Sequence, residues 1–434
     1  MSQLEVLYQH YLSHPEICTD TRRITPGCLF FALKGDKFNA NDFAAKALEQ
    51  GAAYAIIDEP AYQLTAQYIL VPDVLQTLQD LAKLHRSHLN IPVIGLTGSN
   101  GKTTTKELIR AVLQVKYQTF ATSGNLNNHI GVPLSLLAIK PDTEIAVIEM
   151  GANHQQEIAF LCEIAQPTHG LITNIGMAHL DGFGGFEGVK KGKAELFGYL
   201  KAHDGIAFIN QDNPEITEMA QRNGLEEIIS YGQKEGNLIS GKLTQSAPTL
   251  ALAWQKEGSD YKVQTQLTGA YNFENILAAI IIGTTFGLEP AQINMGLSGY
   301  TPVNNRSQLL KTGTNTVICD FYNANPSSME AAIQNLKTMD ASKKTAILGD
   351  MFELGNESTE QHLRIAKLAT TAGFSQVIFI GQMFYNADNT TPENHYFKTP
   401  EEAVRWLTAN PESESLILLK GSRGMALEKL LPLF

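Results

Sequence analysis

The chain contains 434 residues, about three times the roughly 150 residues of a typical domain. Its hydrophobic fraction of 43% and charged fraction of 18% exclude an intrinsically disordered chain and a small disulfide-stapled scaffold. The 33 basic residues are outnumbered by 44 acidic ones, which gives a formal net charge of -11. A protein that binds nucleic acid by neutralising phosphates would carry the opposite sign, so we expect no nucleic-acid partner.

The cysteines and the first residues indicate where the protein works. The four cysteines are Cys18, Cys28, Cys162 and Cys319. None of them forms a C-x-x-C pair, so we expect reduced thiols or small buried hydrophobes, not a zinc site or a disulfide framework. The N-terminus lacks the basic and apolar regions of a signal peptide, and no run of about 18 apolar residues predicts a membrane span. We therefore expect a cytoplasmic protein.

Residues 1–88 form the first of three stretches with different patterns. A glycine-containing turn precedes a buried-strand candidate at 28–33, and 44–58 predicts a helix, a glycine stop and a second strand. Leucines at helical spacing predict a helix over 74–89 that closes the stretch.

From about residue 91, strand and helix patterns alternate, as a parallel α/β sheet requires. The predicted strands are 91–98, 144–151, 170–176, 205–210 and 227–230, with more inside 236–267, and the predicted helices are 103–115, 189–200 and 271–287. A second α/β series follows, with predicted strands at 315–320, 344–350, 376–381 and 415–421. The sequence therefore predicts an α/β protein with domains at 1–88, 89–303 and 304–434.

The segment GLTGSNGKTTTKEL, residues 95–108, carries the strongest functional signal. It lies between a predicted strand and a predicted helix, where glycines let backbone N–H groups face phosphates and the helix dipole adds positive potential. Lys102 would supply a charge for the outer phosphates and Thr103 a hydroxyl for Mg²⁺. Leu96 stands where the usual loop has a glycine, so this is a variant, and the alternative is a glycine-rich turn with an incidental lysine. The predicted nucleotide-binding residues here are Gly98, Ser99, Asn100, Gly101, Lys102, Thr103 and Thr104.

Two further strand ends carry candidate metal ligands. Glu149 ends a predicted strand at the same sheet edge as the phosphate loop, and a carboxylate there is a hard oxygen ligand suited to Mg²⁺. A salt bridge is its alternative role. His179 follows another predicted strand and, taken alone, is more readily a surface histidine than a metal ligand.

Asparagines gather at two places in the middle of the chain. Asn125, Asn127 and Asn128 lie beside a turn and are suited to hydrogen-bonding a sugar or a peptide. Asn272 and Asn275 share one face at a predicted helix start, where their amides can read an adenine edge or, alternatively, cap the helix.

The last stretch adds a polar turn and a basic corner. Asp320 ends a predicted strand and precedes a turn that contains Asn323 and Asn325. Lys420 and Arg423 lie beside glycines after another strand, which is a natural corner for anions. No Ser-His-Asp order, H-E-x-x-H or EF-hand pattern is present, so the motifs indicate chemistry with ATP and magnesium.

Together these segments resemble the Mur ligase family of ATP-dependent amide-bond-forming enzymes over nearly the whole chain. The matching motifs are DTRRITPGCLFFALKG, GLTGSNGKTTTKE, GNLNNHIGVPLSLL, EMGANHQQEI, NIGMAHLDGFG, KKGKAELF, NNRSQ, DFYNANPSSM, LGDMFELG and KGSRGM. GANHQQEI and YNANPSSM match the branch of the family that adds D-alanyl-D-alanine. The resemblance implies a UDP-binding N-terminal α/β domain, a central P-loop ATPase domain with a parallel sheet and a C-terminal doubly wound α/β domain.

The resemblance also implies a two-step ligation by a monomer. Because the ATP motifs and the Arg306 and Asp320 cluster lie in different predicted domains, we expect these domains to close around the substrates. ATP would phosphorylate the carboxylate of UDP-N-acetylmuramoyl-tripeptide, and the amine of D-alanyl-D-alanine would attack the acyl phosphate, releasing ADP and phosphate. The alternatives within this class are another Mur ligase, which adds a single amino acid, and folylpolyglutamate synthase. Outside it, the alternatives are a P-loop NTPase that acts as a switch and a catalytically inactive binding module.

Catalytic roles for individual residues follow from the resemblance. Lys102 would hold the β- and γ-phosphates and Thr103 one Mg²⁺, while Glu149 and His179 would hold a second Mg²⁺. Lys193 would react with CO2 and become an anionic metal ligand as its carbamate.

Lys190 and Lys191 are alternatives to Lys193 in this register. The resemblance further implies that Asn272 and Asn275 contact adenine. Arg306 would reach the nucleotide phosphates, and Asp320 the ribose or phosphate region. The implied substrate contacts are Thr21, Arg22, Lys34 and Gly35 for the UDP group, with Asn125, Asn127, Asn128, Asn323, Asn325, Lys420 and Arg423.

Overall fold

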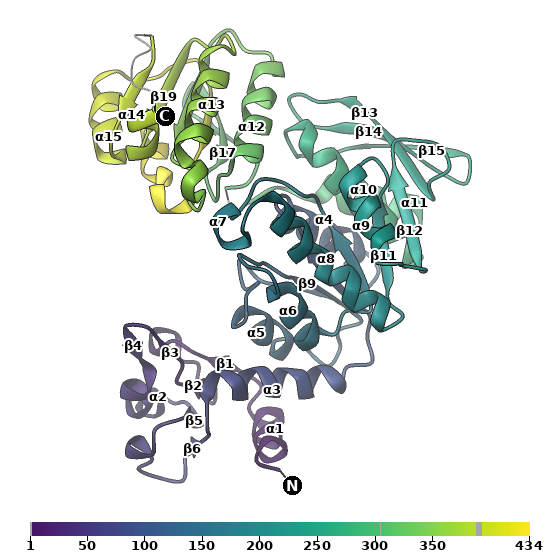
Figure 1. Ribbon diagram of the computed structural model, residues 1–434, viewed down its shortest axis with the longest axis vertical. Helices are drawn as coiled ribbons and strands as arrows, with labels where there is room; N and C mark the ends of the chain where they lie inside the picture. Colours follow the sequence, from purple (N-terminus) through teal and green to yellow (C-terminus); the bar gives the residue numbers. More distant parts are fainter. Residues whose placement is uncertain (1, 304, 388–392) are drawn as a thin grey trace.

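The computed structural model describes residues 2–303, 305–387 and 393–434. Within these residues, three main sheets of four, nine and six strands follow one another along the chain (Figure 1). We call the parts of the chain around them the N-terminal, central and C-terminal domains. Met1 and Asn304, the first residues of two predicted domains, lie outside the described residues. None of the described helices is long and apolar enough to cross a membrane.

The N-terminal domain has a parallel sheet with the order β1-β2-β5-β6 and helices on both faces. Its strands are β1 (Ile17–Cys18), β2 (Leu29–Phe31), β5 (Tyr54–Ile57) and β6 (Tyr68–Leu70), with a hairpin of β3 (Lys34–Gly35) and β4 (Phe38–Asn39). Its helices are α1 (Gln3–Ser13), α2 (Ala44–Glu49) and α3 (Val74–Ser87). Phe31 faces the core beneath α1 and α3, and Phe30 faces the core beneath α2, so the predicted buried strand is confirmed.

The central domain is built on the sheet ordered β15-β14-β13-β12-β11-β10-β7-β9-β8. Its strands are β7 (Val93–Thr97), β8 (Thr119–Ala121), β9 (Ile145–Glu149), β10 (His169–Ile172), β11 (Ile206–Asn210), β12 (Ile228–Gly232), β13 (Ile239–Gln245), β14 (Ala251–Lys256) and β15 (Ser259–Gln264). Its helices are α4 (Lys102–Leu113), α5 (Gly131–Leu137), α6 (Glu157–Ala165), α7 (Leu180–Phe183), α8 (Phe186–Ala202), α9 (Pro214–Arg222), α10 (Phe273–Thr285) and α11 (Pro290–Gly299).

The strand directions in this sheet agree only in part with the prediction of a parallel sheet. The strands from β8 to β13 pair in parallel, whereas β13, β14 and β15 pair antiparallel. The prediction is wrong for this edge because alternating polarity identifies a strand but not the direction of its partner. α10 is buried, as predicted, with Ile276 and Ile280 in the core, and Gly287 follows its end at φ 70°. It packs against α4.

The C-terminal domain has the sheet order β16-β17-β21-β18-β19-β20. Its strands are β16 (Gln308–Thr312), β17 (Asn315–Asp320), β18 (Lys344–Gly349), β19 (Gln376–Ile380), β20 (His395–Phe397) and β21 (Leu416–Lys420). Its helices are α12 (Pro326–Thr338), α13 (Ser358–Thr370), α14 (Gln382–Ala387) and α15 (Pro400–Ala409). Separate cores on the two faces contain α12 with α13 and α15 with the C-terminal segment, which confirms the doubly wound fold.

The helix α3 fixes the N-terminal domain to the central domain. Leu81 of α3 and Leu161 of α6 lie in one hydrophobic core. The buried guanidinium of Arg86 donates to the carbonyl oxygens of Ala165 and Gln166 at 2.9 and 2.8 Å. These carbonyls end α6, where the helix dipole favours a cation.

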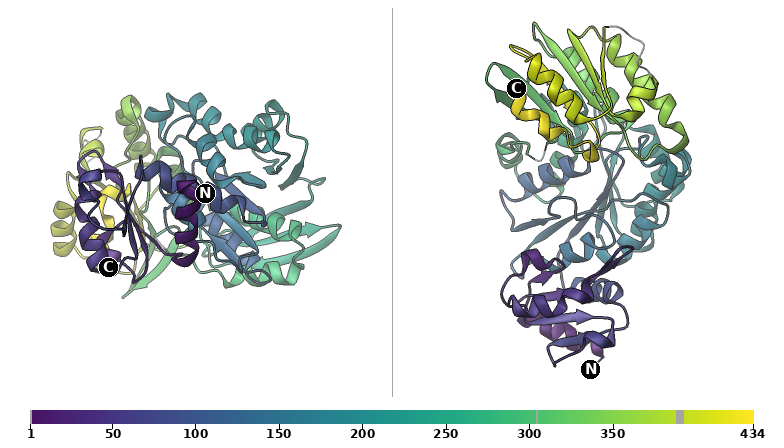
Figure 2. Two further views of the ribbon diagram at one scale, coloured as in Figure 1. Left: turned by 90° about the horizontal axis from the view of Figure 1, so that it is seen from below. Right: turned by 90° about the vertical axis from the view of Figure 1, so that its left-hand side faces the viewer.

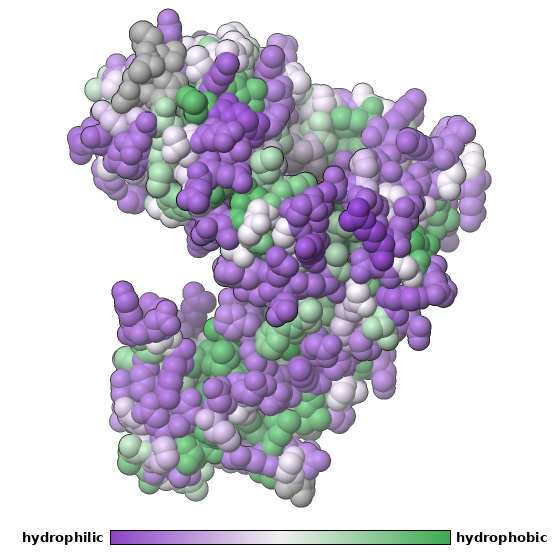
Figure 3. All heavy atoms as spheres, in the orientation of Figure 1, coloured by the Kyte–Doolittle hydropathy of each residue, from purple (hydrophilic) through white to green (hydrophobic). Residues whose placement is uncertain are grey.

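The central domain carries the other two domains at different places on its surface. In Figure 1 and in the right-hand view of Figure 2 the N-terminal and C-terminal domains lie at different ends of the central domain, and Figure 3 shows a hollow between them. The C-terminal domain lies over the carboxyl ends of β7 and β10, because Asn325 Nδ2 donates to Asn100 Oδ1 at 2.7 Å and the Met177 amide donates to Ser327 Oγ at 3.2 Å. Ligands of open α/β sheets gather at such strand ends.

Candidate active site

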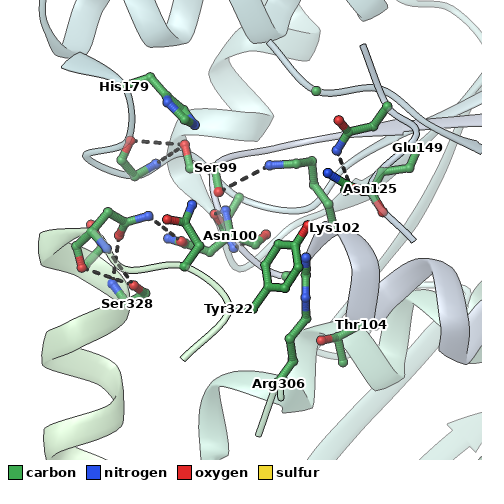
Figure 4. A pocket seen from close by; sticks show the side chains of 18 of the residues that line it. Ser99, Asn100, Lys102, Thr104, Asn125, Glu149, His179, Arg306, Tyr322 and Ser328 are labelled. Atoms are coloured by element: carbon green, nitrogen blue, oxygen red, sulfur yellow. Dashed lines mark hydrogen bonds between the residues drawn. The ribbon is translucent and has the colours of Figure 1, made fainter. Parts of the chain in front are cut away.

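A cavity of about 630 Å³ lies between the central and C-terminal domains (Figure 4). The predicted residues that line it are Ser99, Asn100, Gly101, Lys102, Thr104, Asn125, Asn127, Asn128, Glu149, His179, Asn272, Asn275, Arg306, Asp320, Asn323, Asn325 and Lys420. Gly98, Thr103, Lys193 and Arg423 each contact a residue of this lining. The structure therefore brings together residues from segments far apart in the sequence.

Two glycines of the phosphate loop occupy positions that a larger residue would not fit. Gly98 has φ 147°, and a Cβ there would lie 2.0 Å from Thr173 Oγ1. Gly101 precedes α4 with φ 77°, and a Cβ there would lie 2.8 Å from Asn275 Oδ1. The loop is thus packed against β10 and α10, and its backbone conformation depends on glycine.

Lys102 folds back over this loop. Its ammonium donates to the carbonyl oxygens of Gly98 at 2.7 Å and Ser99 at 3.4 Å. Burial lowers the pKa of Lys102 below its ordinary value, and the negative charge of Glu149 opposes that shift. A phosphate in the cavity would be a stronger partner for this ammonium than neutral carbonyls.

Glu149 ends β9 as a buried carboxylate, 1% exposed. Its Oε1 accepts from Asn127 Nδ2 at 2.8 Å, and its Oε2 accepts from Thr103 Oγ1 at 2.9 Å. Lys106 Nζ lies 4.0 Å from the same Oε2. Sequence reasoning missed Lys106, although a lysine one turn after the phosphate loop was a signal that could have been noticed.

These donors suit a hard cation. No cluster of three His, Cys, Asp or Glu side chains that could hold a metal occurs among the described residues. Mg²⁺ needs no such cage, since it is usually held by one or two carboxylates together with substrate phosphates. Thr103, Glu149 and His179 around one cavity therefore fit Mg²⁺ that arrives with a nucleotide.

His179 lies just before α7 with φ 53°, in the left-handed region, and lines the cavity. Its Nδ1 contacts Oε2 of Glu353 from the C-terminal domain. This interaction lowers the pKa of Glu353. His179 is therefore not a simple surface histidine. Its contact with Glu353 was not predicted, although Glu353 lies within the matching motif LGDMFELG.

Lys193 is buried within α8, 2% exposed. Its Nζ donates to the Ala152 carbonyl oxygen at 3.4 Å and lies 5.0 Å from the centre of the Phe183 ring. Burial, reinforced by the positive charge of Lys102, lowers the pKa of Lys193 to about 7. A large neutral fraction at physiological pH makes this amine unusually nucleophilic for a lysine.

The two neighbouring lysines have other environments. Lys190 forms ion pairs with Glu187 and Glu215 at the surface, and Lys191 is exposed. Of the three lysines in this register, only Lys193 combines burial with proximity to the cavity.

The three asparagines that precede α5 have different surroundings. Asn127 holds Glu149, as described above, whereas Asn128 Oδ1 accepts from the Gly131 amide at 2.8 Å and so fixes the start of α5. Asn125 lines the cavity and is labelled in Figure 4. Asn125 is therefore the member of this group best placed for a bound molecule.

Asn272 and Asn275 lie beneath the phosphate loop. Asn275 Nδ2 donates to Asn272 Oδ1 at 2.9 Å, and Asn275 Oδ1 accepts from Thr105 Oγ1 at 3.0 Å. Asn272 stands at the N-cap position of α10, but its side chain does not bond to the helix start. The capping alternative is therefore wrong for Asn272, and the pair links α10 to α4.

The C-terminal domain contributes charged and aromatic groups to the opposite wall. Lys420 Nζ donates to Asp320 Oδ2 at 2.7 Å. The guanidinium of Arg306 lies 3.8 Å from the centre of the Tyr322 ring, and that of Arg423 lies 5.0 Å from it. Figure 4 shows the side chain of Arg306 alongside the ring of Tyr322. Tyr322, which the sequence analysis did not single out, thus aligns two cations.

The predicted UDP contacts lie elsewhere. Thr21, Arg22, Lys34 and Gly35 belong to the N-terminal domain and are not part of the cavity lining. Lys34 Nζ lies 2.9 Å from carboxylate oxygens of both Asp58 and Glu59, and these hydrogen bonds raise the pKa of Lys34. A phosphate at Lys34 would compete with two carboxylates.

Comparison with known proteins identifies the class of enzyme that this fold and cavity define. Family models match residues 16–86 (Mur ligase family, catalytic domain), 96–283 (Mur ligase middle domain) and 305–423 (Mur ligase, glutamate ligase domain). The chain belongs to the Mur ligase family.

Particular relatives narrow the comparison. The chain is 34% identical to the UDP-N-acetylmuramoyl-tripeptide--D-alanyl-D-alanine ligase of Escherichia coli, over 95% of this chain and 92% of that protein. It is 35% identical to the ligase of the same name from Bacillus subtilis, with the same shares covered. Two solved structures are similar over nearly the whole chain. MurF from Acinetobacter baumannii has a TM-score of 0.87 at 30% identity, covering 99% of this chain and 97% of that one.

The second structure is MurF ligase from Thermotoga maritima in complex with ADP. Its TM-score is 0.85 at 26% identity, and it covers 100% of this chain and 98% of that chain. A folylpolyglutamate synthase from Mycobacterium tuberculosis shares the fold alone, at 16% identity and a TM-score of 0.65.

Proposed function

We propose that this protein is an ATP-dependent ligase that joins D-alanyl-D-alanine to UDP-N-acetylmuramoyl-tripeptide in the synthesis of peptidoglycan precursors. The observation that carries the proposal is the similarity, over 95% of the chain, to ligases named for this reaction. The cavity supports it, since a phosphate loop faces polar groups of a second domain across a space large enough for reacting ligands.

The reaction has two steps. A carboxylate oxygen of the tripeptide attacks the γ-phosphorus of ATP, and ADP leaves with the electrons of the broken P–O bond. The amine nitrogen of D-alanyl-D-alanine then attacks the acyl carbon, a tetrahedral intermediate forms, and phosphate leaves as the nitrogen gives up a proton. The first step moves negative charge onto the phosphate oxygens of ADP, and the second places it first on the acyl oxygen and then on the leaving phosphate. The main task of the protein is therefore electrostatic stabilisation.

Lys102 and the start of α4 supply the first part of that stabilisation. We assign the ammonium of Lys102 to the β- and γ-phosphates, where it exchanges the carbonyls of Gly98 and Ser99 for charged oxygens. We assign residues 98–104 as the nucleotide-binding loop. This loop leads into the N-terminus of α4, where free backbone N–H groups can donate to phosphate oxygens. Thr103 would hold one Mg²⁺, and Glu149 and His179 would hold a second. These ions offset the negative charge of the phosphates when bound.

Lys193 is proposed to act as a carbamate. Its neutral amine attacks CO2, forms an N–C bond and releases a proton, which converts a buried cation into an anion. Two features support this role: the pKa of about 7 and the position of the amine near Lys102, whose positive charge would stabilise the carbamate. Lys102, Glu149, His179 and Lys193 are thus the proposed catalytic residues.

The remaining assignments concern binding. We propose that Asn272 and Asn275 contact adenine and that Arg306 and Asp320 contact the nucleotide. The residues proposed to contact substrates are Asn125, Asn127, Asn128, Asn323, Asn325, Lys420 and Arg423 in the cavity region, with Thr21, Arg22, Lys34 and Gly35 for the UDP group. We also propose domains at 1–88, 89–303 and 304–434, closure of these domains on the substrates, and a monomer that acts in the cytoplasm on small molecules without a nucleic-acid partner.

Phosphate release tests the proposed function. A ligase releases phosphate from ATP only when both UDP-N-acetylmuramoyl-tripeptide and D-alanyl-D-alanine are present. Lys102→Ala should reduce that turnover at least about 100-fold, because it removes a charged partner of the transferring phosphoryl group, whereas Lys140→Ala at an exposed position should not. ATP hydrolysis at the same rate without the two substrates would indicate a nucleotide switch and contradict the proposal.

A further inference from the structure

One side chain of the C-terminal domain reaches the candidate metal ligand of the central domain. Oε2 of Glu353 contacts Nδ1 of His179 (Figure 4 shows His179 at the cavity). His179 comes from the segment after β10, and Glu353 from the segment between β18 and α13. The contact therefore crosses the domain boundary at the edge of the proposed catalytic site.

The segment that carries Glu353 is firmly attached to its own domain. The carboxylate of Asp350 accepts two backbone N–H groups at the start of α14, each at 2.9 Å. The Met351 amide donates to Nε2 of the buried His362 at 3.0 Å, and the Phe352 amide donates to Ser422 Oγ at 3.0 Å. Glu353 follows directly, so its backbone position is set by three anchored residues.

Both partners of the contact have unusual backbone conformations. His179 has φ 53° and Glu353 has φ 63°, in the left-handed region that residues other than glycine rarely adopt. Beside them, Gly355 packs so closely that a Cβ there would lie 2.8 Å from Asp181 Oδ1 of α7. Such conformations persist where the surrounding structure fixes them, which indicates that both domains are built to form this contact.

The chemistry of imidazole gives the contact a role. A carboxylate at Nδ1 favours the tautomer that carries its proton on Nδ1, which leaves the Nε2 lone pair free for a metal and fixes the ring orientation. We propose that Glu353 is a positioning residue that orients His179 for Mg²⁺ from across the domain boundary. This inference rests on the proposed role of His179 as a metal ligand.

A consequence for domain motion follows. His179 has its orienting partner only while the C-terminal domain occupies the position seen in this structure. Movement of that domain away from the central domain would separate Glu353 from His179 and leave the ring free to rotate. Binding of the metal and docking of the C-terminal domain therefore favour each other, as linkage requires.

Metal binding by the full-length protein tests the inference without a turnover assay. Mn²⁺ serves as a paramagnetic substitute for Mg²⁺, and its affinity is measured by electron paramagnetic resonance in the presence of a non-hydrolysable ATP analogue. We expect Glu353→Ala to weaken Mn²⁺ binding about tenfold, the lower end of the effect of losing such a partner. Glu353→Gln keeps a hydrogen-bond acceptor and should stay within about threefold of the unmodified protein. Glu357→Gln, at an exposed site in the same segment, is the control and should have no effect.

A double mutant separates this inference from the proposed function. In a His179→Ala background, Glu353→Ala should cause no further loss, since Glu353 acts through His179. A full additional loss in that background, equal binding by Glu353→Ala and the unmodified protein, or tighter binding by Glu353→Ala would each overturn the inference. If His179→Ala itself leaves Mn²⁺ binding unchanged, the proposed role of His179 fails instead. Equal thermal midpoints of the Glu353→Ala and Glu357→Gln variants ensure that a folding defect does not cause the loss of Mn²⁺ binding.

Discussion

Replacing Lys193 by Met removes a buried amine from α8 while keeping a long, unbranched side chain that suits a helix. The amine is almost free of solvent and has a pKa of about 7 in the folded protein, against an ordinary value of 10.5. Folding therefore removes a proton from Lys193 over the pH range between these two values. Lys193 should make the wild-type protein less stable than the variant at neutral pH, and this difference in the free energy of unfolding should decrease as the pH rises.

The size of the effect follows from proton linkage. Each proton bound by the unfolded but not the folded state changes the free energy of unfolding by about 1.4 kcal/mol per pH unit. The destabilising contribution of Lys193 is largest below pH 7, falls as the pH rises and disappears above 10.5. At pH 7, Lys193 is only half-deprotonated in the folded protein. Between pH 7 and pH 9 the free energy of unfolding of the wild type should therefore rise by about 2 kcal/mol relative to that of Lys193→Met.

Calorimetric unfolding at several pH values in CO2-free buffer measures this difference. About 2 kcal/mol corresponds to a relative shift of roughly 4 °C in the thermal midpoint if the central domain unfolds by itself, and of roughly 2 °C if the whole chain unfolds together. Lys191→Met, at an exposed position on the same helix, is the matched control, and its profile should run parallel to that of the wild type. Parallel profiles for the wild type and Lys193→Met would refute the reasoning, because they would mean that Lys193 keeps an ordinary pKa. Addition of bicarbonate should raise the midpoint of the wild type and not of Lys193→Met, since only the wild type can form the carbamate.

Two further predictions concern the joints between domains. Arg86→Met removes the buried guanidinium of α3 that donates to the carbonyls at the end of α6, and it should lower the free energy of unfolding by about 3 kcal/mol. The variant should have a lower thermal midpoint and be cleaved faster by proteases after α3, and unchanged proteolysis would contradict the prediction. Arg222→Met, at an exposed position, is the control. Asn325→Ala removes both the N-cap of α12 and the hydrogen bond to Asn100, so it should lower the free energy of unfolding by about 2 kcal/mol. Asn325→Asp keeps the cap and loses only the hydrogen bond to Asn100, so its loss should be about 1 kcal/mol. Equal losses of stability in the two variants would show that the cap contributes nothing.

Local patterns were enough to predict the parts of the site that lie on one segment. The phosphate loop was predicted because a strand, a glycine-rich turn and a helix follow one another within a few residues. Glu149 was predicted as a strand end at the same sheet edge, and the structure places it 2.9 Å from Thr103. In each case the information is contained in neighbouring residues.

The residues that were missed act across long separations in the sequence. Glu353 lies in an acidic, solvent-facing segment, and nothing in its neighbourhood points to His179. The ion pairs of Lys34 with Asp58 and Glu59 were not predicted either, because these carboxylates follow a strand that comes later in the chain. The edge strands β16 and β20 were missed as well, since β20 has only three residues and β16 lacks a buried face. Periodicity predicts an element only when one of its faces is buried.

The net charge of -11 is compatible with an anion-binding site because the fold gathers several basic side chains around one cavity, although acidic residues outnumber basic ones in the whole chain. Lys102 approaches the cavity from the central domain, and Arg306 and Lys420 from the C-terminal domain. Burial keeps these cations poorly solvated, so their attraction for a phosphate is stronger than that of surface lysines. The cross-domain contacts use residues of the same site, as Asn325 with Asn100 and Glu353 with His179 show. Any movement of the C-terminal domain must therefore change the field at the phosphate loop, which makes domain docking and phosphoryl transfer parts of one process.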